Sequence, residues 1–187
     1  MTAGKLSNGT AVYATILTYP FTAEGTELPA AQRPNILARI SNVVNPISSS
    51  AFTVSQSALG NPAKVDGLTR FLGAMYTANL FLQSPMNAEC SIAAIQTQLN
   101  VTAATANLEY TAATSIDSGE ISPGGNFTVN QEGLNNVIGV RNQFGGFTVP
   151  SNFDFDAATT PGEGKLIDYS IQNAAVAGLK EFLLQSC

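Results

Sequence analysis

Hydrophobic and polar residues alternate in the first part of the chain, and this pattern favours β-strands. In residues 9–20, GTAVYATILTYP, β-branched and aromatic side chains alternate, which predicts a strand. Residues 47–62 are typical of a second strand followed by a turn. Between the two, residues 22–34 have the composition of a loop, and a short helix is expected from Pro34 to Asn45.

From residue 65 the spacing of the hydrophobic residues becomes that of a helix. Apolar side chains recur at positions i, i+3, i+4, i+7 and i+8, starting at Leu68. Ser84-Pro85 then has the pattern of a helix N-terminus, and Ile92 and Leu99 lie along one side of the helix that follows. These two segments predict an αα-hairpin over residues of about 65–100.

The middle of the chain is harder to interpret. In residues 101–120 the alanines permit a helix, whereas the threonines and the alternation around Leu108 permit a strand, which we favour. Residues 123–150 are rich in glycine and asparagine and contain Phe-Thr-Val twice. We expect this stretch to form short strands joined by glycine turns, as a β-hairpin or an extended arm.

The C-terminal part predicts an amphipathic helix. Thr160, followed by a proline and by Glu163, has the pattern of a capping box, and an apolar stripe at helical spacing follows. We therefore expect a helix over residues of about 161–185. Because no linker-like stretch divides the chain, residues 1–187 are expected to form a single α+β domain with an antiparallel β-sheet.

The composition limits the classes of function. Hydrophobic residues make up 44% of the 187 positions, but charged residues make up only 11%, less than half of the usual ~25%. The net charge is −5. Weak charge lowers the repulsion between like subunits, so the composition favours a protein that packs against copies of itself.

The sequence bears on nucleic-acid binding, on a membrane span and on the location of the protein. The eight basic residues are scattered singly, so no nucleic-acid partner is expected. The most apolar run, residues 68–82, contains Arg70 and Asn79 and is too short to span a membrane. No signal peptide is visible in MTAGKLSNGT, and a virion or an extracellular assembly is the favoured location.

The sequence is poor in catalytic residues. It contains no histidine, which removes the commonest general base and the commonest metal ligand. Cys90 and Cys187 are the only cysteines, and their spacing matches neither a metal motif nor a disulfide scaffold. We therefore expect two free thiols, no cofactor and a protein that is not an enzyme.

Carboxylates offer one local cluster. Asp154 and Asp156 alternate with Phe153 and Phe155, which favours a half-buried strand with a solvated acidic face. The same two aspartates with Glu163 are a candidate calcium site, since calcium prefers oxygen ligands.

These observations favour a non-enzymatic structural subunit that self-associates as a homo-oligomer. Such a subunit could be a virion component, such as a capsid, cement or tail protein, or part of a filament or surface layer. One alternative is a module that binds a small ligand or a glycan, and another is a histidine-independent enzyme that uses carboxylates. The candidate assembly contacts lie in the glycine-rich stretch: Gly124, Gly125, Phe127, Phe144, Gly145, Gly146 and Phe147.

Overall fold

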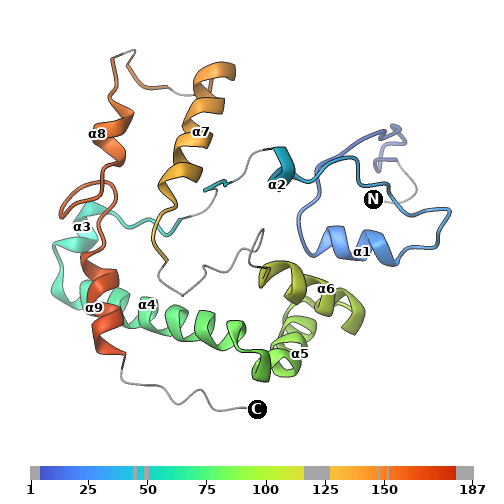
Figure 1. Ribbon diagram of the computed structural model, residues 1–187, viewed down its shortest axis with the longest axis horizontal. Helices are drawn as coiled ribbons and strands as arrows, with labels where there is room; N and C mark the ends of the chain where they lie inside the picture. The colour runs from blue at the N-terminus through green and yellow to red at the C-terminus, as the bar shows by residue number, and fades with distance from the viewer. Residues whose placement is uncertain are drawn as a thin grey trace. The chain divides into compact units, whose positions relative to one another are not determined.

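The computed structural model is built from helices (Figure 1). It describes residues 5–43, 46–48, 51–115, 127–146, 148–150 and 152–179. The elements are α1 (Phe21–Glu27), α2 (Ile40–Val43), α3 (Gln56–Leu59), α4 (Pro62–Gln83), the 3-10 helix η1 (Pro85–Asn87), α5 (Ala88–Leu99), α6 (Ala103–Ala113), α7 (Gln131–Phe144), α8 (Phe155–Thr159) and α9 (Ser170–Gly178).

The predicted α+β fold is wrong. The described residues are 57% helical, and they contain no sheet. Their one β-type pairing is an isolated antiparallel bridge between Lys5 and Ala11. Residues 9–20 have the composition of a strand, but no strand in the described part of the chain pairs with them. β-Propensity describes how well a side chain fits a pleated surface, and it has no effect where no sheet is present.

Two segments that were predicted as β-structure are helices. Residues 101–120 contain α6, which begins after Thr102, whose side chain accepts a hydrogen bond from the Thr105 backbone N–H. Residues 123–150 contain α7, which begins after Asn130, whose side chain accepts from the Gly133 N–H. In both cases a polar N-cap satisfies a backbone donor of the first turn, and this local stabilisation is absent from a strand.

The chain divides into two compact units, which are described separately. The first contains residues 1–37 and 84–120 together with residue 187, and α6 packs against both α5 and α1 in it. Its buried side chains are small: Ala23, Ser91, Thr105 and Ala106, together with Asn87. The single-domain interpretation of the sequence stays a prediction.

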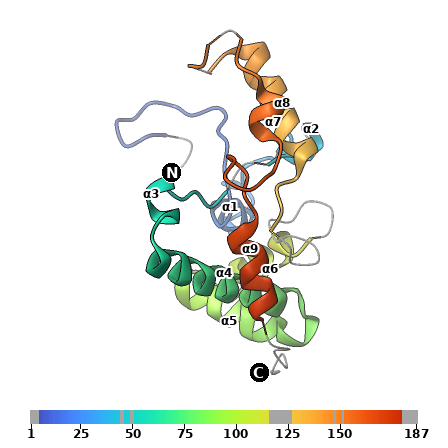
Figure 2. The same cartoon turned by 90° about the vertical axis from the view of Figure 1, so that its left-hand side faces the viewer.

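The second unit contains residues 38–83 and 121–186, and its centre is the pair α4 and α9. α9 lies against α4 in both views (Figure 1, Figure 2). Gly73 leaves room for Leu179, which would lie 3.9 Å from a Cβ at that position. Phe52 packs edge-on against Phe71, with 5.6 Å between the ring centroids.

The sequence predicted the positions of some helices but not the elements against which these helices pack. α4 and α5 are helices as expected. α4 packs against α9 in the second unit and α5 packs against α6 in the first, and the pairing of α4 with α5 as a hairpin stays a prediction. The C-terminal helix begins at Ser170 and not near residue 161, and residues 180–185 lie outside the described residues. Thr160 ends α8 instead of starting a helix.

Candidate functional site

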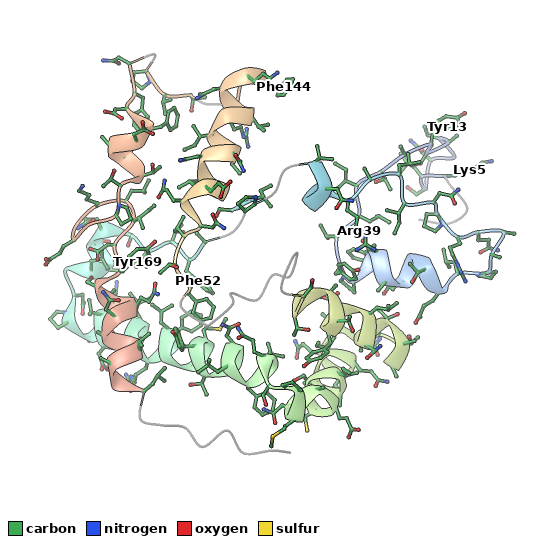
Figure 3. The ribbon with its side chains drawn as sticks, viewed as in Figure 1. Lys5, Tyr13, Arg39, Phe52, Phe144 and Tyr169 are labelled. Atoms are coloured by element: carbon green, nitrogen blue, oxygen red, sulfur yellow. The ribbon has the colours of Figure 1, made fainter. Side chains whose placement is uncertain are left out.

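The predicted assembly contacts fall into two groups. Gly124, Gly125 and Phe147 lie outside the described residues. Of the others, Phe144, Gly145 and Gly146 come together at the C-terminal end of α7, where Phe144 is labelled in Figure 3.

Phe127 belongs to a different environment, inside the second unit. Its ring packs edge-on against that of Tyr76 on α4, with 5.4 Å between the centroids. Nearby, the Val129 backbone N–H donates to the Tyr169 hydroxyl at 3.0 Å. The segment that leads into α7 is therefore fastened to α4 and to the residue that precedes α9.

The first turns of α7 are anchored by residues 46–48. Ser48 Oγ donates to the Asn130 carbonyl at 3.0 Å, and the Asn136 side chain donates to the Pro46 carbonyl at 2.9 Å. At Gly133 the two backbones approach so closely that a Cβ would lie 2.8 Å from the Ile47 carbonyl carbon. Only glycine fits this contact without a backbone shift.

One apolar stripe runs along α7 and is covered at one end only. Gly133, Val137, Val140 and Phe144 recur at i, i+4, i+7 and i+11, so they lie on one side of the helix. Gly133 is buried under residues 46–48, whereas Val140 is 43% exposed and Phe144 is 77% exposed. We call Val140 and Phe144 the open end of α7.

Two glycines turn the chain away beyond the open end. Gly145 and Gly146 have φ of 81° and 114°, a region in which side chains with a Cβ are strained. A Cβ on Gly146 would also collide with the guanidinium of Arg141. The turn thus depends on glycine, and it leaves the ring of Phe144 uncovered.

The predicted carboxylate cluster is not assembled as a metal site. Asp154 is the N-cap of α8, and its Oδ1 accepts the Ala157 N–H at 2.9 Å, while Asp156 lies in the first turn. The two aspartates are therefore in a helical start and not in the strand that was predicted. Across the described parts of the chain, no three acidic or cysteine side chains form a group that could hold a metal ion, and this includes Glu163.

A different carboxylate closes the loop before α9. Asp168 accepts backbone N–H groups from Gly164 at 2.6 Å and from Ser170 at 2.8 Å. These bonds, the one from Gly164 most, lower the pKa of Asp168 below its ordinary value of 3.8 because they favour the ionised form. Gly164 has φ of 72°, so the loop depends on a glycine there. Both oxygens of Asp168 serve the loop itself.

Sequence reasoning missed a polar clamp in the first unit. Glu27, at the end of α1, accepts hydrogen bonds from the hydroxyls of Thr102 at 2.8 Å and Thr105 at 2.9 Å. Thr105 is fully buried, and a negative charge at the N-terminus of α6 is favourable. The threonine cap was visible in the sequence, but its partner lies 75 residues earlier than Thr102. This clamp holds α1 to α6 and offers no reactive group.

Two further findings concern the class of protein. Cys90 is disulfide-bonded, so the expected free thiol is wrong there, and Cys187 lies outside the described residues. Among the helices of the described residues, none combines the length and the apolar character that a membrane span requires, in agreement with the sequence.

Comparison of the chain with family models, with curated proteins and with solved structures finds no match. The helical fold overturns the α+β part of the sequence interpretation, and nothing found supports a virion, a capsid or self-assembly. Of the predicted contact residues, Phe144 lies in the open end of α7, and its exposed side chain is available to a partner.

Proposed function

We propose that this chain is a non-enzymatic structural subunit that associates with a second copy of itself through the open end of α7. One observation carries the proposal: the apolar stripe of α7 is covered at Gly133 and continues uncovered to Val140 and Phe144. A helix usually buries such a stripe along its whole length.

A second copy suits this surface because the helix is nearly free of charge. α7 carries only Glu132 and Arg141, and the whole chain has 11% charged residues. Two identical faces of this kind meet without strong repulsion, and a two-fold axis lets the same patch serve both copies. An acidic or basic partner would find little to pair with on this helix.

The contribution of the open end of α7 to association can be estimated from the burial of its side chains. Covering an exposed phenylalanine or valine side chain contributes about 1.5–3 kcal/mol, and a two-fold interface counts each residue twice. A charge placed at Phe144 in both copies is therefore expected to weaken association by on the order of a hundredfold or more, because every 1.4 kcal/mol changes the dissociation constant about tenfold.

The test is the molar mass of the protein in solution. Light scattering coupled to size-exclusion chromatography, over a wide range of concentrations, should show a dimer for the unmodified protein and a monomer for Val140→Asp and for Phe144→Asp. Asn142→Asp is the matched control, because Asn142 is exposed and lies on the opposite side of α7. It adds the same charge and should leave the dimer unchanged.

Two results would count against the proposal. One is an unmodified protein that remains monomeric at every concentration. The other is a dimer that weakens equally with the charge at Asn142, because the effect would then come from net charge and not from the stripe.

A further inference from the structure

The first described residues of the chain form a tight hairpin. Lys5, labelled in Figure 3, is bridged to Ala11 in the antiparallel sense. The Leu6 N–H donates to the Thr10 carbonyl and the Gly9 N–H donates to the Leu6 carbonyl, both at 2.9 Å. Gly9 has φ of 85°, a region that favours glycine. Because all these contacts join near neighbours in the sequence, the hairpin needs no partner from elsewhere in the chain.

Asn8 lies in the turn of this hairpin and is exposed. The stretch Asn8-Gly9-Thr10 has the N-x-S/T pattern of an asparagine that accepts a glycan. The Asn8 Oδ1 accepts the Thr10 N–H at 3.0 Å, as in an Asx turn. Among the described residues, neither the Asn8 Nδ2 nor the Thr10 hydroxyl has a hydrogen-bonding partner. Glycan transfer uses these two groups, the amide nitrogen as nucleophile and the hydroxyl as the group that the transferase recognises.

A second N-x-S/T pattern, at Asn100, differs from the first in its hydrogen bonds. Asn100 is also exposed, but the Thr102 hydroxyl donates to Glu27 at 2.8 Å and accepts the Thr105 N–H at 3.0 Å. Glu27 precedes Thr102 by 75 residues, so it is already present when Thr102 leaves the ribosome. The third such pattern begins at Asn126, outside the described residues. The fold therefore leaves the hydroxyl free beside Asn8 and occupies it beside Asn100.

The disulfide of Cys90 is an independent observation that points the same way. Disulfides form and persist in the oxidising compartments through which secreted proteins pass. Glycans are transferred to asparagine in compartments of the same kind. The state of Cys90 therefore supports contact between this chain and such a transferase.

We propose that Asn8 carries an N-linked glycan, transferred from an oligosaccharide that is held on a lipid diphosphate. In this step the Asn8 Nδ2 loses one proton to a base of the transferase and attacks C1 of the first sugar. The bond between Nδ2 and C1 forms, the bond between C1 and the phosphate oxygen breaks, and the lipid diphosphate leaves with the electron pair. No oxidant or reductant takes part. The inference concerns the first unit and does not rest on self-association through α7.

A glycan at this position would hydrate a stretch of the chain that lacks charge. No charged residue lies between Lys5 and Glu24, although Tyr13 is 96% exposed and Ile16 is 79% exposed. Exposed, uncharged and β-prone residues of this kind favour aggregation. A glycan is bulky and solubilising, and on Asn8 it lies a few residues from these side chains. It supplies the hydration that charged side chains provide on other proteins.

Peptide mass spectrometry of the protein from its own source tests the inference directly. A peptide-N-glycosidase removes an N-linked glycan and converts the asparagine that carried it to aspartate. In heavy-oxygen water the new carboxylate also takes up the heavy isotope. The peptide that contains Asn8 should be converted and labelled, whereas the peptide that contains Asn100 should keep its asparagine.

Variants expressed in the same host test the role of each group. Asn8→Gln removes the nucleophile and Thr10→Ala removes the recognised hydroxyl, so each should lose the whole mass of the glycan. Thr10→Ser keeps a hydroxyl and should retain the glycan. Asn100→Gln is the matched control, because it removes the other exposed asparagine of this pattern, and it should leave the glycan mass unchanged.

Three results would overturn the inference. The first is an Asn8 that is unmodified in the protein from its own source. The second is equal modification of Asn100, because the tripeptide pattern and not the fold would then select the site. The third is a glycan that persists in Thr10→Ala, because the free hydroxyl would then have no part in the transfer.

Discussion

Replacing Thr105 by valine tests the polar clamp between α1 and α6. Valine has nearly the same shape as threonine but lacks the hydroxyl that donates to Glu27 at 2.9 Å. The side chain of Thr105 is fully buried, whereas Glu27 is exposed and keeps its bond to Thr102. The change therefore removes one hydrogen bond to a carboxylate and leaves little unsatisfied.

The expected loss of stability follows from these partners. A hydrogen bond to a charged group contributes about 1.5–3 kcal/mol, and the exposure of the carboxylate favours the lower end of this range, about 1.5 kcal/mol. Removing the Thr102 hydroxyl should lower the free energy of unfolding by more, about 2 kcal/mol, because this hydroxyl also caps α6 by accepting a hydrogen bond from the Thr105 N–H. Urea denaturation followed by far-UV circular dichroism measures both changes through the shift in midpoint.

The control lies on the same helix. Thr111 is exposed, and its hydroxyl bonds only to the Asn107 carbonyl, so Thr111→Val should change stability by less than about 0.5 kcal/mol. A double-mutant cycle with Glu27→Gln should give a coupling energy of about 0.5 kcal/mol or more between positions 27 and 105. Equal effects at Thr105 and Thr111, or additive effects at 27 and 105, would refute the clamp.

The remaining predictions concern other contacts of the fold. Gly133→Ala should destabilise the protein by about 1–3 kcal/mol, because the new Cβ would press on the backbone at Ile47. Gly139 has open space around it, so Gly139→Ala should stabilise the protein by about 0.5–1 kcal/mol. Thermal melting distinguishes the two signs. Because the pKa of Asp168 is lowered, its carboxylate stabilises the native state above pH 3.8, and this contribution is lost as the pH falls through the lower pKa of the native state. Asp168→Asn should therefore flatten the fall in melting temperature below pH 3.8. A retained slope would show that other carboxylates dominate. Cys90 should react with a maleimide only after reduction, as read by peptide mass spectrometry, and labelling without reduction would contradict its disulfide.

The sequence predicted those elements whose signals are local. The apolar spacing from Leu68 and the Ser84-Pro85 pair indicated two helices, and α4 and α5 are there. A helix closes all its hydrogen bonds within a few residues, so its pattern suffices to predict it. The glycine pair at residues 145 and 146 was expected to form a turn between strands, and the structure places it instead at the end of α7, where Phe144 is uncovered.

Tertiary structure decided the rest, because a strand or a clamp needs a partner that the local sequence does not contain. The alternating residues 9–20 predicted a strand, yet the described chain offers them no second strand, and Val12 to Ile16 form no backbone–backbone hydrogen bond. Glu27 meets Thr102 only because the fold joins positions 75 residues apart. The sequence also could not predict which part of α7 is covered, because this depends on the contact of residues 46–48 with Gly133. The sequence alone determined the helices α4 and α5 and which residues are apolar, and packing determined which of the apolar surfaces are left open.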